Sequence, residues 1–330
     1  MMTPPIQTAT TRRRALQWIG TAAGSLALPA WSAWPEKTLR IVVTFPPGGA
    51  SDIVARVMAE QLARKLGQPV VVDNRPGAGG NLGAEMVVRS TPDGYTLLMS
   101  TASLTVNVTL YPKMPFDARR DLIPITQVAS APIVLTIHPS VPARTVRELI
   151  ELSKRTRGGL NFGSNGNGTT SHLSGLILAQ MSGLELTHIP YKGAGAAING
   201  LLTGQADMAF LSVFSATPHI KQGRLRGLAA STKRPAPSLP DLPTLDSMYP
   251  GFETDNWFAL FAVRGTPQAI VDQLHADLIK ILQHPTMKNF IEREGGYPIG
   301  NTPKEFEDAI ARDIAKYAKA VKASGAKPDQ

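Results

Sequence analysis

Residues 39–66, LRIVVTFPPGGASDIVARVMAEQLARKL, join an apolar run to a helical pattern through a turn of prolines and glycines. After the turn, apolar side chains recur at three- and four-residue spacing, which predicts a helix with one buried face. These positions are Ile53, Val54, Val57, Met58, Leu62 and Leu66. A short strand followed by a turn and a helix is the repeating unit of α/β proteins with parallel strands.

The same alternation continues along the chain. Strands are predicted at 69–74 and 95–100 with a helix at 82–89, and a second series starts with IVLTIH at 133–138. That series continues through the strands LNFGS, LELTHIP and DMAFLS, with helices at 145–156, at 170–181 and from Gly195. A proline-rich segment, 235–250, reads as a surface linker before the apolar strand NWFALFAV and helices at 267–283 and 303–321.

This order predicts an α/β protein of two lobes, each a mainly parallel sheet flanked by helices. Two crossings between the lobes are expected, near residues 129–132 and 251–256. Residues 34–131 and 254–330 then form a discontinuous first lobe, and residues 132–253 form the second lobe.

The N-terminal segment is typical of an export signal. Arg12, Arg13 and Arg14 precede an uncharged run, 15–30, that ends in small residues. The run is too short and too diluted by Gln17 and glycines for a membrane span. We therefore expect a signal peptide over residues 1–33, removed near Trp34, and a periplasmic location. The arginines suit the twin-arginine route and the general secretory route equally.

Composition excludes several classes of function. The chain has no cysteine, which rules out disulfides, thiolate catalysis and cysteine metal sites. The formal charge of +9 comes from scattered lysines and arginines without the dense run expected of a nucleic-acid-binding tail. The six histidines show no HxH, HxxxH or HExxH spacing, so no metal is expected.

Enzyme motifs are also missing. The glycine-rich turns lack the last glycine of a dinucleotide fingerprint, and no phosphate-binding GxxxxGK[ST] occurs. Ser164 lacks the glycine that opens a nucleophile elbow. We expect no catalytic residue and no cofactor.

Four strand-to-helix turns are rich in glycine or hydroxyl groups, at 45–52, 74–81, 163–172 and 191–195. Ligands of open α/β sheets bind at such turns, where helix N-termini present backbone N–H groups. In the first turn Pro46 and Pro47 restrict φ, while Gly48 and Gly49 leave the backbone bare. The hydroxyls of the third turn favour an anion, especially a carboxylate; they belong to Ser164, Thr169, Thr170 and Ser171.

Several of these residues have a structural alternative. Asp52 suits a helix N-terminus and also a ligand contact, and His172 suits capping or packing as well as a cleft. Tyr191 could cover the core or face the cleft, and Lys192 could stay solvated. For Asp207 we favour a structural role.

Taken in order, the segments resemble the solute receptors of tripartite tricarboxylate transporters, also called the Bug family of periplasmic binding proteins. The resemblance rests on LRIVVTFPPGGASDIVAR, VVVDNRPGAGGNLGAE, PDGYTLLM, GSNGNGTTSHL, IPYKGAGAAINGLLTGQADMAF and NWFALFAVRGTP. It implies a type II, "Venus flytrap" fold whose two lobes close on a small organic acid without catalysis, with ordered waters helping to hold its carboxylate.

Carried over residue by residue, the resemblance implies three groups of ligand-binding residues. The first lobe supplies Pro47, Gly48, Gly49 and Asp52. The second lobe supplies Ser164, Gly168, Thr169, Thr170, Ser171 and His172. A supplementary group consists of Asn81, Ser103 and Tyr191.

The implied function is that of a monomeric receptor that delivers its ligand to the membrane permease of a tripartite transporter. Two alternatives stay open: a receptor that feeds a signalling system such as a sensor kinase, and an exported hydrolase. Thr44-Phe45 and Asn165-Gly166-Asn167 depart from the family's pattern. The ligand is therefore left open among dicarboxylates, tricarboxylates, amino acids and aromatic acids.

Overall fold

The computed structural model describes residues 1–2, 34–324 and 326–328. The predicted signal peptide therefore lies almost wholly outside the described residues. The described residues from Lys37 onward form one compact unit, and every element below belongs to it. None of the described helices has the length and apolar character needed to cross a membrane.

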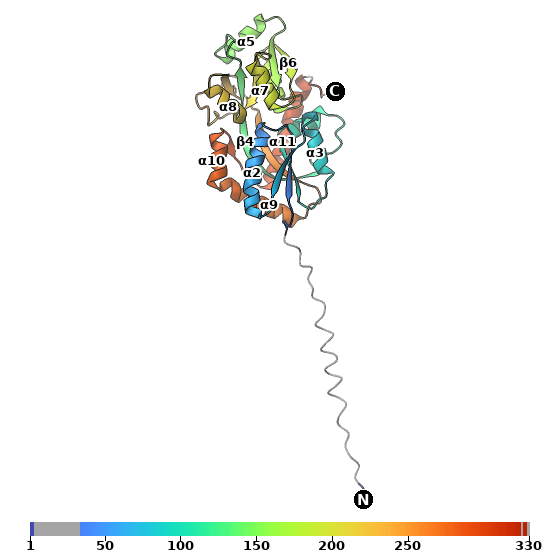
Figure 1. Ribbon diagram of the computed structural model, residues 1–330. Coiled ribbons are helices and arrows are strands. Elements are labelled where there is room, and N and C mark those ends of the chain that lie inside the picture. The colour runs from blue at the N-terminus through green and yellow to red at the C-terminus, as the bar shows by residue number, and fades with distance from the viewer. Residues whose placement is uncertain (3–33, 325, 329–330) are drawn as a thin grey trace. The chain divides into compact units, whose positions relative to one another are not determined.

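Ten strands of the described chain form one sheet (Figure 1). Eight of them pair in the order β2-β1-β3-β9-β4-β7-β5-β6, and β8 and β10 each pair with β4 outside this path. Their bounds are β1 Leu39–Val43, β2 Val70–Asn74, β3 Thr96–Thr101, β4 Leu122–Ile137, β5 Leu160–Ser164, β6 Leu186–Pro190, β7 Met208–Ser212, β8 Arg226–Ala230, β9 Asp255–Val263 and β10 Tyr297–Pro298.

The strands are parallel toward the two ends of this path and antiparallel in its middle. β1 runs parallel to β2 and β3, and β5 runs parallel to β6 and β7. β9 is antiparallel to β3 and β4, and β4 is antiparallel to β7 and β8. The predicted α/β alternation is present, and the two long central strands make the sheet mixed.

β4 is the strand that joins the two ends of the path. Its first part pairs with β9 from Leu122 to Pro132, and its last part pairs with β7 from Ile133 to Ile137. The sequence predicted only the last part. The first part of β4 was not recognised because Pro124 and the register shifts that follow it interrupt the regular pattern of a strand.

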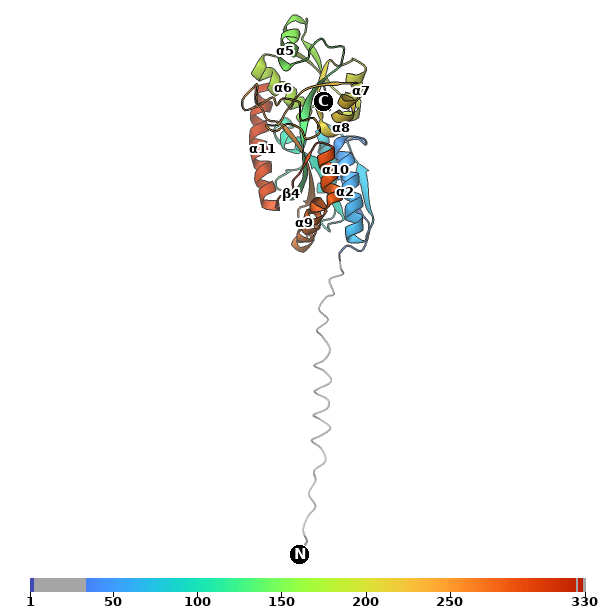
Figure 2. The ribbon, with the colours of Figure 1, turned by 90° about the vertical axis from the view of Figure 1, so that its left-hand side faces the viewer.

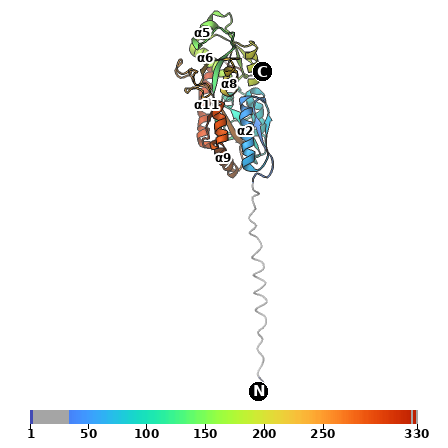
Figure 3. The ribbon, with the colours of Figure 1, turned by 60° about the vertical axis from the view of Figure 1, so that its left-hand side comes forward.

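Helices flank the sheet, and Figure 2 shows α11 running along one side from the level of α6 toward that of α9. α11 packs against α4, α6 and β4, while α2 and α9 lie side by side, as Figure 3 also shows. The helices are α2 Ala50–Leu66, α3 Asn81–Val88, α4 Ser103–Leu110, α5 Val146–Arg155, α6 Thr170–Ser182, α7 Ala194–Leu202, α8 Val213–Lys221, α9 Gln268–Gln283, α10 Pro285–Arg293 and α11 Pro303–Ser324, with a 3₁₀ turn, η1, at Ala78–Gly80.

Three short helices, α4, α8 and α10, were not predicted. α4 has the sequence SLTVNVTL, whose β-branched residues do not favour a helix, and α8 contains Pro218. The predicted linker at 235–250 is also more than a surface segment. Ala236 and Leu245 are fully buried in it, so this stretch packs onto the second half of the sheet.

Buried apolar residues form separate clusters at the two ends of the sheet. One contains Leu98, Phe261 and Phe306, which bring together β3, β9 and α11. Another contains Leu135 and Phe162 among residues of β4, β5, α5 and β7. Each end of the sheet thus has its own core.

Candidate functional site

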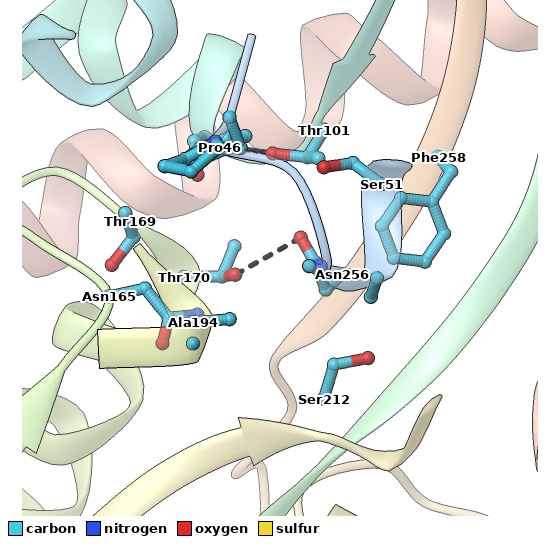
Figure 4. Close-up of a pocket in the computed structure, with 15 residues that line it drawn as sticks. Pro46, Ser51, Thr101, Asn165, Thr169, Thr170, Ala194, Ser212, Asn256 and Phe258 are labelled. Carbon is cyan, nitrogen blue, oxygen red and sulfur yellow. Dashed lines mark hydrogen bonds between the residues drawn. The ribbon is translucent and has the colours of Figure 1, made fainter. Parts of the chain in front are cut away.

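A small pocket lies where the two ends of the sheet face each other (Figure 4). We call it the small pocket. It is lined by Phe45, Pro46, Gly49, Ala50, Ser51, Thr101, Ser103, Asn165, Thr169, Thr170, Ala194, Gly195, Ser212, Asn256 and Phe258.

Five helix N-termini converge on the small pocket. α2 begins at Ala50, α4 at Ser103, α6 at Thr170 and α7 at Ala194, and Ser212 is the N-cap of α8. Among these described helices, the N-cap residues of α2, α4, α7 and α8 make no side-chain cap hydrogen bond, while the Ser103 N–H at the start of α4 donates to Thr101 Oγ1 at 3.3 Å. The first N–H groups of a helix have no partner inside it and carry partial positive charge, so this arrangement favours an anion.

The polar side chains of the pocket are uncharged, and they stand beside apolar ones such as Phe45 and Phe258. Ser212 is almost fully buried, and neither its Oγ nor the Oδ1 of Asn165 has a hydrogen-bond partner among the described residues. Thr170 Oγ1 donates to Asn256 Oδ1 at 3.2 Å, which links α6 to β9 beside the cavity (Figure 4). Of the described residues that line the pocket, none carries a charge. An anion here would be held by N–H groups and hydroxyls.

The volume of the small pocket matches a small polar group. The space that the centre of a water molecule can occupy inside it is about 40 Å³. On this measure one water needs roughly 10–15 Å³, so a carboxylate or a few waters fit.

The turn between β1 and α2 is fixed by Asp52. Its Oδ2 accepts from the Gly48 N–H at 2.9 Å, and its Oδ1 lies 3.0 Å from Arg56 Nη2. Burial alone would raise the pKa of Asp52, but the hydrogen bonds from Arg56 and Gly48 hold that pKa below its ordinary value. Asn74 Nδ2 donates to the Phe45 carbonyl at 3.0 Å. Asp52 therefore shapes the turn from behind the pocket.

The turn between β5 and α6 is fixed in a similar way. Ser164 Oγ lies 2.7 Å from His188 Nε2 and accepts from the Gly166 N–H at 3.2 Å. Thr169 caps α6 by accepting from the His172 N–H, and its hydroxyl donates to the Gly166 carbonyl at 2.7 Å. These bonds hold Asn165, Thr169 and Thr170 at the cavity wall.

Two histidines stack behind this turn. The rings of His172 and His188 are parallel within 9° and their centroids are 4.1 Å apart. Burial lowers the pKa of His172 to about 3, and His188 adds to the effect. A neutral ring can accept at Nδ1, and the Gly168 N–H donates to that atom at 3.4 Å. His172 is thus a neutral support of the turn at physiological pH.

A larger cavity, which we call the chamber, adjoins the small pocket. Its volume on the same measure is about 590 Å³, and it shares Phe45, Pro46 and Asn165 with the small pocket. It is lined by Phe45, Pro46, Pro76, Gly77, Ala78, Gly79, Gly80, Asn165, Gly166, Pro190, Tyr191, Lys192 and Gly193. The two cavities together have the size usual for a small-molecule site.

A receptor family accounts for this arrangement. The sequence model described as "Tripartite tricarboxylate transporter family receptor", TctC, matches residues 54–326. The chain belongs to this receptor family. Protein BugT of Bordetella pertussis (strain Tohama I / ATCC BAA-589 / NCTC 13251) is 35% identical over 321 residues, covering 96% of this chain and 98% of BugT.

Two solved structures of receptors extend the comparison. R. palustris Rpa4515 with adipate has a TM-score of 0.86 and 32% identity, covering 89% of this chain and 99% of that protein. The periplasmic binding protein BugD has a TM-score of 0.85 and 32% identity with the same coverage. The periplasmic binding protein fold is thereby confirmed, and the family consists of solute-binding proteins rather than enzymes.

In this receptor the predicted binding residues fall into separate groups. Four line the small pocket and one lines the chamber; they are Gly49, Ser103, Thr169 and Thr170, and Tyr191. Pro47 and Gly48 are exposed at the tip of the first turn and line neither cavity. The ligand-binding role of all thirteen predicted residues stays a prediction.

The remaining predicted residues support the walls. Asp52, Ser164 and His172 make the contacts given above. Ser171 Oγ donates to the Phe210 carbonyl at 2.6 Å, and Asn81 Oδ1 accepts from Asn107 Nδ2 at 2.9 Å. Gly168 has φ +75° and lies so close to Asn107 and Leu110 that a Cβ would be 2.6 Å from each. Asp52 and His172 thus make the contacts expected of residues that hold the turns in place, at a helix N-terminus and in ring packing respectively.

Sequence reasoning missed four polar or aromatic residues of the small pocket that lie outside the turns it singled out. Thr101 and Ser212 end β3 and β7, so the rule that ligands bind at the carboxyl ends of strands could have found them. Asn256 and Phe258 come from β9, which enters the site antiparallel to its neighbours. No sequence signal in a turn pointed to them.

Proposed function

We propose that this receptor captures a small organic acid between two lobes in the periplasm and delivers it to the permease of a tripartite tricarboxylate transporter. The observation that carries the proposal is the convergence of four helix N-termini, whose N-cap residues make no side-chain cap hydrogen bond, on an uncharged, buried pocket. Such a pocket suits one carboxylate. Adipate, found with the related Rpa4515, is an acid of this kind.

We assign the lobes to residues 34–131 with 254–330 and to residues 132–253. The separate cores at the two ends of the sheet support this division, and so does the passage of β4 and β9 between them. The two strands would act as the hinge. A ligand that touches both lobes stabilises the closed form by binding it more tightly than the open form.

Export to the periplasm is part of the proposal. The arginines at 12–14 and the uncharged run after them support a signal peptide, and the related BugD is a periplasmic binding protein. Protein purified from the periplasm should begin near Trp34. Intact-mass measurement tests this, and a chain that keeps residues 1–33 would contradict it.

Ligand capture can be tested by thermal unfolding of the chain that starts at Trp34, against mono-, di- and tricarboxylates, amino acids and aromatic acids. An acid at 100 times its dissociation constant adds about 2.7 kcal/mol to the free energy of unfolding, which gives a clear rise in Tm. Uncharged amides of the same acids are the control. No shift with any acid, or equal shifts with acids and amides, would contradict carboxylate capture.

Delivery to a permease needs a separate test. Deleting the permease genes should abolish uptake of the acid that the receptor binds, while the purified receptor still binds it. If uptake persists and a transcriptional response to the acid is lost on deleting the receptor gene, the receptor serves a signalling system instead.

A further inference from the structure

The chamber differs in chemistry from the small pocket. Phe45, Tyr191 and three prolines supply apolar surface, and the remaining walls are mostly glycine backbone. Of the described residues that line it, Lys192 alone carries a charge, and none is acidic. Such walls favour an apolar body over a chain of hydroxyl groups.

The backbone of the chamber wall depends on glycine. Gly77, Gly79, Gly80, Gly166 and Gly193 all have φ between +63° and +135°, a region that side chains other than glycine rarely adopt. Side chains are thereby excluded from five wall positions. A cavity of about 150 Å³ lined by apolar residues is enough to bind benzene, and the chamber measures about 590 Å³.

The two cavities adjoin along three shared lining residues, and in the inference below one molecule lies across both. They share Phe45, Pro46 and Asn165, so a carboxylate in the small pocket leaves the body of its molecule beside the Phe45 ring. The body then continues between the first-lobe wall at 76–80 and the second-lobe wall at 190–193. Lys192, whose side chain is exposed, lies in that second wall.

We propose that the receptor selects a carboxylic acid with an apolar body of aromatic-ring size, and that Lys192 favours a second negative group at the far end of that body. This inference rests on the proposed function, because it assumes that the first carboxylate occupies the small pocket. It adds the class of acid and the residue that discriminates within that class.

The expected selectivity follows from burial and charge. Burying a phenyl-sized group should make benzoate bind at least about tenfold more tightly than acetate. An ion pair at an exposed lysine is weaker and should favour a second carboxylate by about two- to fivefold. The body therefore dominates affinity, and Lys192 adjusts it.

Isothermal titration calorimetry on the full mature chain tests both parts. Acetate, succinate and benzoate vary the body, whereas 4-methylbenzoate and benzene-1,4-dicarboxylate share a ring and differ in the second charge. Lys192→Glu reverses the charge in the chamber wall. Lys319→Glu is the matched control, because Lys319 is exposed on α11, lines neither cavity and gives the same change in net charge.

The proposal expects benzoate to bind more tightly than acetate and succinate, and the aromatic diacid to bind more tightly than 4-methylbenzoate. Lys192→Glu should remove or reverse that second preference and leave 4-methylbenzoate within about twofold, whereas Lys319→Glu should change neither.

Three results would overturn it. Tighter binding of succinate or acetate than of benzoate would refute the role of the chamber while leaving carboxylate capture intact. A diacid preference that survives Lys192→Glu would refute the role of Lys192. Failure of every carboxylate to bind a folded receptor would instead overturn the proposed function, and this inference with it.

Discussion

At the scale of single residues, the closeness of Gly193 to Pro46 shows how tightly the opposing turns meet. Gly193 has φ +92°, and a Cβ placed there would lie 2.9 Å from both Cγ and Cδ of Pro46. These two residues come from the α7 and α2 turns, which carry two of the N-termini at the pocket. The two turns can therefore approach this closely because Gly193 has no Cβ.

We predict that Gly193→Ala weakens acid binding by at least about tenfold, because the added methyl group separates the turns that the ligand must bridge. It should also lower the free energy of unfolding by about 1–2 kcal/mol, since alanine is strained at positive φ. Calorimetry and thermal unfolding measure the two effects.

Gly204→Ala is the matched control, because Gly204 has φ +72° but nothing within 4 Å of the added Cβ. It should cost less stability than Gly193→Ala, because no atom opposes its added Cβ, and it should leave affinity unchanged. Equal affinity of the Gly193→Ala variant and the natural receptor would show that the turns do not need this contact.

Residue-level prediction from the sequence worked where position alone decides the outcome. Gly49, Thr169, Thr170 and Ser103 begin helices, and any residue at the start of these helices must face the site. It did not resolve Asp52 or His172, because their roles depend on the direction in which each side chain turns. The Asp52 side chain turns toward Arg56, one turn further along α2, and His172 stacks on His188 of β6.

At the scale of elements, β4 and β9 carry a buried carboxylate where they pass between the two ends of the sheet. Ser130 Oγ on β4 donates to Asp255 Oδ2 on β9 at 2.7 Å, while Oδ1 of Asp255 is buried without a partner among the described residues. Burial raises the pKa of Asp255 to about 6, the Ser130 bond lowers it, and nearby Asp313 raises it against the opposing effect of Lys316. Asp255 is thus poorly suited to carry charge.

We predict that Asp255 makes a contribution to stability that falls as the pH rises from about 3.8 to about 6. In that window the folded protein keeps a proton on Asp255 that the unfolded chain has released, so this contribution to the free energy of unfolding decreases with pH, by at most about 3 kcal/mol. His172 acts in the opposite direction between about pH 3 and 6.5, because its lowered pKa keeps it neutral in the folded protein while it is charged in the unfolded chain. Asp255→Asn should therefore make stability rise more steeply from pH 4 to pH 6 than in the natural protein and should raise Tm at pH 8, as measured by thermal unfolding between pH 4 and pH 8.

Asp241→Asn serves as the control, because Asp241 is exposed and the change in charge is the same. It should leave the pH profile as it is. A difference in stability between Asp255→Asn and the natural protein that stays constant from pH 4 to pH 6, with no gain for the variant at pH 8, would contradict this account of the hinge strands.

Elements were predicted from the sequence when their periodicity was long and regular. α2, α9 and α11 repeat apolar positions over 16 or more residues, whereas α8 is nine residues with a proline inside. β4 was recognised only where it is free of proline and bulges. The shape of the hinge therefore had to come from the structure.

At the scale of the whole molecule, the order of the motifs predicted the receptor family and its fold, since strand-turn-helix units recur in a fixed sequence. The composition of the pocket was not predictable in the same way. Thr170 meets Asn256 across 86 residues of chain, and α2 meets α7 across more than 100. Only the folded sheet brings these segments to one point.

The most direct test of carboxylate capture is a crystal structure of the mature receptor with the acid that raises Tm most. The account predicts one carboxylate in the small pocket, with oxygens about 2.7–3.2 Å from, or one water away from, the first N–H groups of α2 and α7 and from Ser212 Oγ. A carboxylate paired instead with Lys192 in the chamber wall, with waters alone at the helix N-termini, would contradict it.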